Sequence, residues 1–275
     1  MIRQLALASC LALLGGCAGM ATSTASASAV GAASFEGVLA GSWRDPANVA
    51  RDRYRHPAET LAFFGVAPTH TVIEITPGGG WYAELLAPYL ATGGQYIGAM
   101  PAAAPETGGG RRNAALRQKL AGNPVYGAAR LVEFDPKDPA FGPAASADVV
   151  LTFRNLHNWL ADGTTESHLR AAHDALKPGG VLGVVDHRAR PGTAIATSRK
   201  SGYVAEQLVI DLAAQAGFVL EARSEVNANP QDDTDHPNGV WTLPPVNRHD
   251  AADDAMYKAI GESDRMTLRF RKPAR

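Results

Sequence analysis

One short segment constrains the fold of this chain more than any other: a β-branched run that leads through glycines into a helix. Residues 71–76 read TVIEIT, residues 77–80 read PGGG, and apolar residues recur at helical spacing over 81–90. The apolar pattern therefore changes from the period of a strand to that of a helix within four residues. A strand followed at once by a helix is the repeating unit of α/β folds.

The rest of the chain continues this alternation, and no internal repeat is visible. Further strands are expected at 95–100, 129–134, 147–153, 181–186, 218–226 and 264–270, and further helices at 46–64, 111–120, 164–176, 203–216 and 251–260. Strands alternating with helices favour a parallel sheet, whereas the last two strands have no full helix between them. We therefore expect one α/β domain with a single doubly wound, mostly parallel seven-stranded sheet whose last strand is antiparallel.

The N-terminal residues have the pattern of an export signal. Arg3 precedes an apolar run over 5–14, which is shorter than the about 20 residues needed to cross a bilayer. The run ends in Leu-Gly-Gly-Cys, which resembles the lipobox of bacterial lipoproteins. That resemblance implies cleavage before Cys17 and acylation of this cysteine. The alternative is an ordinary secretory signal that is cleaved near residues 25–29.

The residues that follow predict a tether. Residues 18–34 are rich in Ala, Ser, Thr and Gly and poor in bulky side chains. We expect a signal peptide at 1–16, a lipid anchor and tether at 17–44, and the α/β domain at 45–275, exported to the periplasmic face of the bacterial envelope. The chain has 2 cysteines. Cys10 would leave with the signal and Cys17 would carry the lipid, so no disulfide is expected.

Charge and motifs exclude several classes of function. Lys+Arg 26 against Asp+Glu 27 gives a formal net charge of -1, whereas a dedicated nucleic-acid binder has a clear basic excess. The sequence contains no Gly-x-Ser-x-Gly elbow and no Gly-x-x-x-x-Gly-Lys-Ser/Thr loop, which argues against a serine hydrolase and a P-loop enzyme. We expect a small molecule, a lipid or an envelope component as substrate, and no nucleic acid. The sequence does not indicate an oligomeric state.

A ligand is expected at the glycine-rich turn, because open α/β sheets bind ligands beyond the carboxyl ends of their strands. Glycines let a ligand approach the backbone, and the amides of the helix beginning near Trp81 favour a carboxylate or phosphate. Gly78-x-Gly80-x-x-Ala83 has the spacing of a dinucleotide fingerprint. That fingerprint requires an acid about 20 residues later, where residues 98–101 read Gly-Ala-Met-Pro. A nicotinamide cofactor is therefore disfavoured.

Four segments of the sequence carry a resemblance to a known family. They are VIEITPGGGWYAELLAPYL at 72–90, ADVVLTFRNLHNWL at 147–160, LKPGGVLGVVDHR at 176–188 and DRMTLRFRKP at 264–273. These segments resemble the class I S-adenosylmethionine-dependent methyltransferases, and within that family a bacterial group of exported, predicted methyltransferases. The resemblance covers about residues 45–273. It implies a Rossmann-like methyltransferase fold and S-adenosylmethionine as cofactor.

The resemblance also assigns residues to the cofactor site. Glu74 matches the acid of the first-strand motif, and Gly78 and Gly80 match two of its glycines. Thr76 stands where the first glycine is usual, so the loop is expected to take a different path. Met100 stands where the ribose-binding acid of the family is expected, and its loss removes charge-assisted hydrogen bonds. The expected cofactor contacts are Glu74, Thr76, Pro77, Gly78, Gly79, Gly80, Met100, Asp135 and Asn155.

Two of these residues have a second interpretation. Asp135 either approaches the adenine edge, as third-strand acids of the family do, or forms a turn with the following proline. Asn155 either holds the cofactor or substrate, or caps the short helix that follows it. In the N-terminal helical segment, Tyr54 and His56 could fold over the cofactor. The arginines around them favour the alternative of a solvated, charged helix face.

The candidate catalytic residues are His157, Asp186 and His187. The resemblance places the methyl-acceptor site after the fourth strand, where His157 could remove a proton from the acceptor. Asp186 and His187 end the fifth strand on the ligand side of the sheet, and an Asp beside a His could orient an imidazole or bind a metal. Neighbouring residues of a strand point to opposite faces, which argues against their meeting.

Three functions remain open. The first is an S-adenosylmethionine-dependent methyltransferase of unknown acceptor. The second is a methyltransferase-fold protein that has lost methyl transfer and serves as a ligand-binding or structural envelope lipoprotein, which Met100 and the export signal favour. The third is a metal-dependent enzyme that uses the acidic stretch 232–236. That stretch fits no metal-binding template, so we expect a solvated polar loop there and no metal.

Overall fold

The computed structural model describes Met1 and residues 34–274. The expected signal peptide, the anchor at Cys17 and the tether up to residue 33 lie outside the described residues. Among the residues that are described, no helix is both long enough and apolar enough to span a bilayer.

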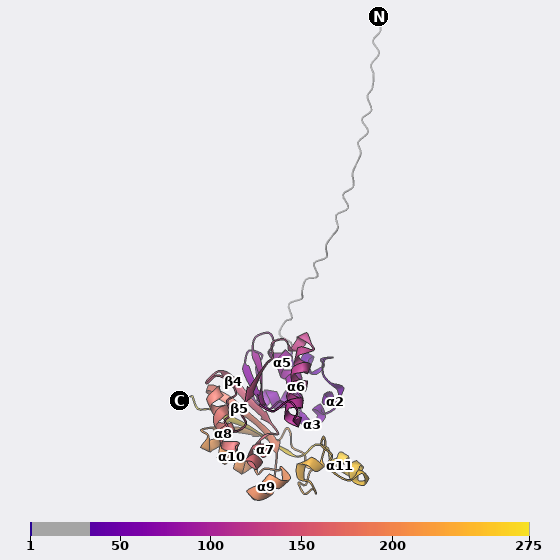
Figure 1. Ribbon diagram of the computed structural model, residues 1–275, viewed down its shortest axis with the longest axis vertical. Coiled ribbons are helices and arrows are strands. Elements are labelled where there is room, and N and C mark those ends of the chain that lie inside the picture. Colours follow the sequence, from indigo (N-terminus) through magenta and orange to yellow (C-terminus); the bar gives the residue numbers. More distant parts are fainter. Residues whose placement is uncertain (2–33, 275) are drawn as a thin grey trace. The chain divides into compact units, whose positions relative to one another are not determined.

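A seven-stranded sheet forms the centre of the domain (Figure 1). Its strands are β1 Thr71–Ile75, β2 Gln95–Pro101, β3 Arg130–Phe134, β4 Ala147–Phe153, β5 Leu176–His187, β6 Val219–Ser224 and β7 Arg265–Arg271, in the spatial order β3-β2-β1-β4-β5-β7-β6. Neighbours from β3 to β5 are parallel, and β7 runs antiparallel to both β5 and β6. The predicted fold class, including the antiparallel last strand, is confirmed.

Helices cover both faces of the sheet. They are α1 Phe35–Leu39, α2 Pro46–Val49, α3 Asp52–Arg55, α4 Pro57–Phe63, α5 Ala83–Leu90, α6 Gly108–Ala121, α7 Leu156–Asp162, α8 Thr165–Ala175, α9 Ile195–Ser201, α10 Glu206–Gln215 and α11 Asp254–Ile260, with short 3-10 turns at Pro124–Tyr126, Gly239–Thr242 and Ala251–Asp253. One apolar core contains residues of α1, α4, α5 and α6, and the other contains residues of α7, α8 and α10.

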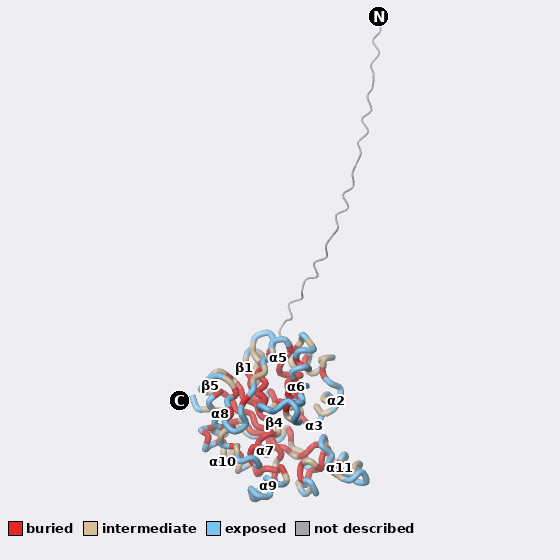
Figure 2. Tube along the Cα trace, in the orientation of Figure 1, coloured by how far each residue is buried: buried red, intermediate tan, exposed pale blue. Residues whose placement is uncertain are grey.

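The strands supply both cores because successive side chains point to opposite faces. Val72 packs in the core under α5, whereas Ile73 packs in the core under α8. In Figure 2 the buried residues accordingly fill the interior between the helices. A strand buried on both sides needs a continuous apolar run, which is the pattern that the sequence shows at β1 and β4.

The N-terminal part of the domain differs from the prediction in two ways. The expected helix at 46–64 is three short helices, because the chain breaks at His56, whose φ of 39° is left-handed, before Pro57. The tether was also expected to reach residue 44, and that is wrong for its last part. Helix α1 lies in this region, its Val38 is fully buried, and Phe35 packs edge-on against Tyr89.

The sheet order positions the ligand site. Strand β1 pairs with β2 on one side and with β4 on the other, and the chain leaves β1 toward one face and β4 toward the other. The crevice at the carboxyl ends of β1 and β4 is thus the topological switch point, where open α/β sheets bind their ligands.

Candidate functional site

A cleft of about 520 Å³ lies at the carboxyl ends of β1 and β4. The turn after β1, the N-terminal helices, the start of α7 and the loop near Trp241 all contribute to it. Its lining residues are Asn48, Arg51, Arg55, Glu74, Thr76, Pro77, Gly78, Gly79, Trp81, Tyr82, Arg112, Phe153, Arg154, Asn155, His157, Asn158, Trp241, Pro245 and Val246. Most of the residues predicted for a cofactor therefore lie around one cavity.

The glycine-rich turn presents open backbone to this cleft. A Cβ atom at Gly78 or Gly79 would have no heavy atom within 4 Å, whereas one at Gly80 would lie 2.7 Å from Leu116. The first two positions therefore leave space for a ligand, and the third must be small because α6 packs against it. Gly78 and Gly80 have φ values of 59° and 82°, in the left-handed region.

Thr76 adopts a backbone conformation that glycine favours, with φ of 53°. The residue that replaces the usual first glycine thus keeps a conformation that glycine adopts readily. A β-branched residue in the left-handed region carries strain of order 1–3 kcal/mol. The Thr76 amide donates to the Ala99 carbonyl at 2.7 Å, which holds the turn against the end of β2.

Glu74 is buried at the base of the cleft and accepts a hydrogen bond from the Tyr96 hydroxyl at 2.7 Å. Burial raises its pKa to about 7, although the Tyr96 hydrogen bond and the charge of Arg55 oppose that shift. The acid of the first-strand motif is thus a half-protonated carboxyl near neutral pH, held by Tyr96.

Three predicted cofactor residues, Gly80, Met100 and Asp135, do not line this cleft. Met100 is 1% exposed and belongs to the core under α5 and α6, where it packs among residues such as Leu116. Asp135 is exposed, and its carboxylate accepts a hydrogen bond from the Lys137 amide at 2.8 Å. Asp135 therefore forms a turn with the residues that follow it. The apolar side chain of Met100, which packs in the core, stands at the position of the ribose acid.

Asn155 joins the two strands that border the cleft. Its side-chain amide donates to the Ile75 carbonyl at 2.8 Å and to the Thr152 hydroxyl at 3.2 Å. It occupies the N-cap position of α7 but makes no side-chain capping hydrogen bond. Asn155 thus contributes to the site by tying the end of β4 to the end of β1.

The three candidate catalytic residues lie together, and of these only His157 lines the cleft. His157 Nδ1 lies 2.9 Å from Asp186 Oδ1, and the His157 amide donates to the same carboxylate at 3.3 Å. The His187 amide donates to Asp186 at 2.7 Å. All three residues are buried, and the rings of His157 and His187 are 4.9 Å apart. The expectation that strand alternation would separate Asp186 from His187 does not hold, because one side-chain nitrogen or oxygen atom of each of the three residues lies within 4.8 Å of the others.

His187 is held as a neutral ring. Arg154 Nε donates to its Nε2 at 3.2 Å, so the proton resides on Nδ1, which donates to Ser263. Burial, and then the positive charge of Arg154, keeps the pKa of His187 well below its usual range. His187 is therefore a positioning residue for Arg154.

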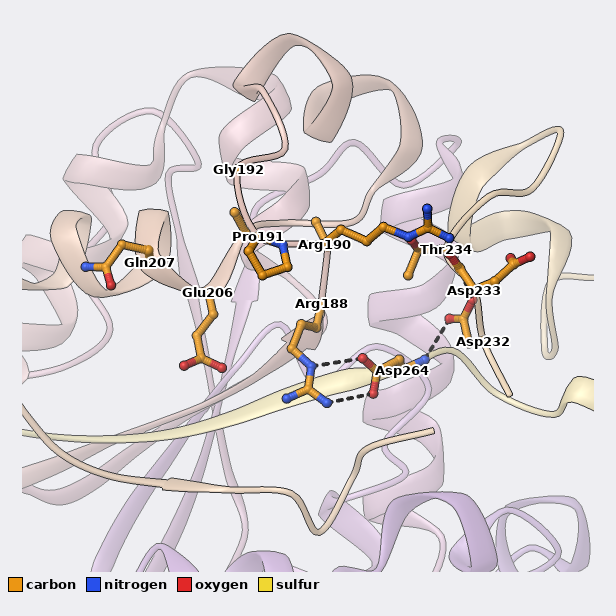
Figure 3. A pocket seen from close by; sticks show the side chains of 12 residues that line it. Arg188, Arg190, Pro191, Gly192, Glu206, Gln207, Asp232, Asp233, Thr234 and Asp264 are labelled. Atoms are coloured by element: carbon orange, nitrogen blue, oxygen red, sulfur yellow. Dashed lines mark hydrogen bonds and ion pairs between the residues drawn. The ribbon is translucent and has the colours of Figure 1, made fainter. Parts of the chain in front are cut away.

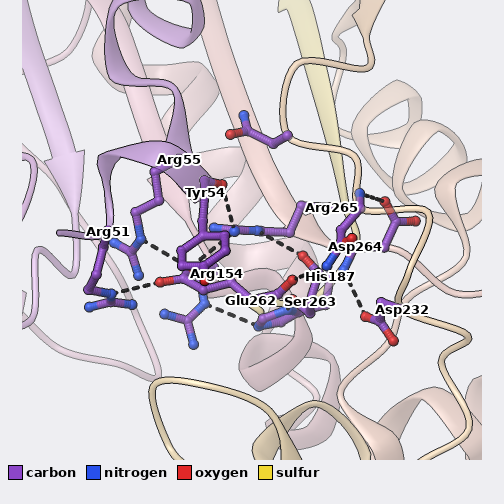
Figure 4. A network of polar contacts seen from close by, with 12 residues as sticks. Arg51, Tyr54, Arg55, Arg154, His187, Asp232, Glu262, Ser263, Asp264 and Arg265 are labelled. Carbon is purple, nitrogen blue, oxygen red and sulfur yellow. Dashed lines mark hydrogen bonds and ion pairs between the residues drawn. The ribbon is translucent and has the colours of Figure 1, made fainter. Parts of the chain in front are cut away.

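A buried arginine cluster was not anticipated from the sequence (Figure 4). Glu262 pairs with Arg51 at 2.7 Å, Arg55 at 3.2 Å and Arg265 at 3.0 Å. The arginines of the N-terminal helices were expected on a solvated face, yet Arg51 and Arg55 line the cleft and Arg55 also stacks on Trp81. Glu262 lies more than 200 residues from Arg51 and Arg55 in the sequence, so no local sequence pattern could have revealed these ion pairs.

A second cavity, of about 630 Å³, lies beyond β5 (Figure 3). Arg188 makes a bidentate contact with Asp264 at 2.9 and 3.0 Å, and Arg190 donates to the backbone carbonyl of Asp233. Asp232 accepts hydrogen bonds from Tyr203, His236, and the amides of Thr234 and Asp264. These contacts anchor the loop around Asp232.

The pH dependence of stability tests the arginine cluster. Burial opposes ionisation of Glu262, but Arg265, Arg55 and Arg51 outweigh it and hold its pKa at about 2. A depressed pKa stabilises the fold above the unfolded value near 4.5, and this contribution is lost as the pH falls from 4.5 toward 2. Urea unfolding should show wild type more stable than Glu262→Gln by about 3 kcal/mol at neutral pH, with the gap closing below pH 4.

The exposed pair of Glu166 with Arg170 provides the control. Glu166→Gln should change stability little at any pH, because exposed ion pairs contribute little. If the free energies of unfolding of wild type and Glu262→Gln changed with pH in parallel, the arginines would not hold the pKa of Glu262 below its usual value.

Neither a protein-family model nor a curated protein matches this chain. Solved structures do match it. An S-adenosylmethionine-dependent methyltransferase from Aquifex aeolicus matches with a TM-score of 0.56 and 13% identity over 87% of this chain and 98% of the other. A methyltransferase from Methanosarcina mazei matches with a TM-score of 0.54 and 10% identity, over 78% and 98%.

A third similar structure is named as the [4+2]-cyclase SpnF, with a TM-score of 0.59 and 16% identity over 80% of this chain and 82% of the other. At these identities the likeness concerns the fold and not the reaction. The comparisons and the strand order agree, and the chain has the fold of the S-adenosylmethionine-dependent methyltransferases.

Proposed function

We propose that this protein is an S-adenosylmethionine-dependent methyltransferase whose acceptor is a small molecule, a lipid or an envelope component. The observation that carries the proposal is the arrangement of one cleft: the open glycine turn after β1 and His157, which is paired with Asp186, line the same cavity. The first feature is a place for a cofactor, and the second is a group that can move a proton.

The residues present fit S-adenosylmethionine in part. Gly78 and Gly79 leave open backbone where the methionine moiety would lie, and Glu74 faces the same cleft. A carboxylate for the ribose hydroxyls is lacking at Met100, so binding is expected to be weaker than in proteins that have one. When bound, the cofactor would supply a methyl group on a positively charged sulfur, ready for attack by a nucleophile.

His157 would hold or remove the proton of the acceptor. Asp186 accepts the Nδ1 proton of His157, which leaves Nε2 as the basic atom of the ring. The carboxylate also stabilises the positive charge that the ring gains when it takes a proton. Asn155 and the Asp186 contacts to two backbone amides keep this pair at the ends of β4 and β5.

A second candidate function is ligand binding without methyl transfer. Met100 fills the ribose-acid position with an apolar side chain, and the similar structure SpnF is named as a cyclase, which demonstrates that this fold serves other reactions. The two candidates differ in whether S-adenosylmethionine binds in the cleft.

Calorimetric titration distinguishes them. Wild type should bind S-adenosylmethionine and its demethylated product, and Gly78→Arg should abolish the heat of binding because the side chain fills the turn. Gly179→Arg is the matched control. Gly179 has φ of 77° and equally open space, but it lies near the start of β5, at the end of the strands opposite to the cleft. No heat from wild type at millimolar ligand would refute the methyltransferase proposal.

The role of His157 is tested by turnover. Once an acceptor is identified, His157→Asn and Asp186→Asn should each lower the rate of methyl transfer by about 10²–10⁴-fold, because general-base catalysis contributes that much. Their affinity for the demethylated cofactor should change by less than threefold. An unchanged rate in His157→Asn would remove this residue from the catalytic machinery.

We also propose that the protein is exported and held in the bacterial envelope by lipid on Cys17. The support is the sequence alone, since the lipobox-like segment lies outside the described residues. Stable anchoring requires more than one acyl chain, as lipidation of such a cysteine provides. In cell fractionation Cys17→Ala should move the protein from the membrane to the soluble fraction, and Cys10→Ala should leave it with the membrane. Retention of Cys17→Ala in the membrane would refute the anchor.

A further inference from the structure

The candidate cleft carries an excess of positive charge. Its lining contains four guanidinium groups, from Arg51, Arg55, Arg112 and Arg154, and a single carboxyl, that of Glu74. Burial raises the pKa of Glu74 to about 7, so this carboxyl is only partly ionised near neutral pH. The wall of the cleft therefore does not neutralise its own arginines.

The carboxylates behind the wall do not neutralise them either. Glu262 is shared among Arg51, Arg55 and Arg265, which leaves one negative charge for three positive ones. Arg154 makes no ion pair with any carboxylate in the described part of the chain, and its partner is the neutral ring of His187. Uncompensated charges in a partly buried site are costly, which makes this cluster an unusual feature to retain for stability alone.

Two of these arginines also have unused donors. Arg51 Nη2 is buried and has no hydrogen-bond partner among the described residues. Within residues 34–274, the Arg154 side chain donates through Nε alone. In Figure 4 the Nη ends of Arg51 and Arg154 extend away from Glu262 and His187, without contacts to the residues drawn. Both residues line the cleft. Arg51 Nη2 would meet a ligand there after a small movement of the side chain, whereas Arg154 keeps only its Nε engaged.

The backbone conformation that places the Arg154 side chain at the cleft is strained. Its φ of 61° lies in the left-handed region, which is strained for a side chain of this size. The Arg154 amide donates to the Val185 carbonyl at 2.8 Å, and Nε is fixed by His187. The chain thus orients the planar Nη edge of this guanidinium, an arrangement that suits bidentate binding of a carboxylate or phosphate.

We infer that Arg51 and Arg154 form a subsite for an anionic group, a carboxylate or a phosphate, of the substrate that lies beside His157. Arg112, an exposed side chain at the rim, adds to the attraction. This inference rests on the proposed function, because it names the substrate class of the same cleft: an acceptor that carries an anionic group apart from the atom that is methylated. The anionic group of such an acceptor would also place a negative charge beside the positively charged cofactor.

The experiment measures binding of simple anions to the full chain. Inorganic phosphate and succinate are titrated calorimetrically at constant ionic strength, with chloride as the balancing ion to keep screening equal. Wild type should bind at least one of them, and the preferred probe identifies the group as a phosphate or a carboxylate. Arg154→Gln and Arg51→Gln should each weaken binding about tenfold or more, as loss of a charge-assisted hydrogen bond predicts.

Two further variants keep the test independent of folding defects. Arg112→Gln removes an exposed side chain that makes no described contact with a carboxylate, and should weaken binding severalfold with unchanged unfolding. Arg190→Gln is the matched control, because Arg190 lines the other cavity, and it should leave binding unchanged. Equal binding by wild type and all four variants would overturn the subsite and leave an adventitious ion only.

The demethylated cofactor provides the last arm, because its own carboxylate is the other possible occupant. If Arg154→Gln weakens the anion but changes cofactor affinity less than twofold, the subsite belongs to the substrate. If the anions compete with the cofactor and Arg154→Gln weakens both equally, the arginines hold the cofactor and the inference is overturned. Cofactor binding without anion binding overturns the subsite alone. Anion binding without cofactor binding supports the anion site but refutes the proposed methyltransferase.

Discussion

The shape of the candidate site depends on the ion pairs of one buried carboxylate, that of Glu262. It lies just before β7 and binds Arg51 and Arg55 from the N-terminal helices as well as Arg265 from β7 itself. This contact brings helices α2 and α3 across the carboxyl ends of the strands. The cleft therefore has a wall that the sheet by itself would not supply.

The cluster is better explained by function than by stability. A buried ion pair often contributes no more to stability than an apolar group of the same volume, because desolvation offsets the attraction. Here the balance is less favourable still, with three guanidinium groups on one carboxylate and Arg154 beside them without a carboxylate of its own. Burial, together with the charges of neighbouring arginines, lowers the pKa of Arg154 to about 10, despite the opposing charge of Glu262. An anionic ligand would reduce this excess of positive charge over negative charge.

The fold and the chemistry of the cleft are separate matters. Seven strands in this order belong to a fold that serves methyl transfer and, in a structure named as a cyclase, another reaction. The open backbone at Gly78 and Gly79 is where a cofactor of that fold would bind, and the buried Met100 is where a usual contact is lacking. Under the proposed function, the reaction depends on the residues around the cleft, and above all on His157, Asp186 and the arginines.

The sequence by itself determined the alternation of strands and helices, the glycine turn and the position of His157 at the end of β4. These follow from local causes: the period of apolar residues, the backbone freedom of glycine and the break imposed by proline. Only the tertiary structure decided that Asp186 reaches His157, that Met100 belongs to the core, and that Arg51 lines a cleft and pairs with Glu262. Each of these depends on a partner far away in the chain, and the pairing of charges across more than 200 residues leaves no periodic trace in the sequence.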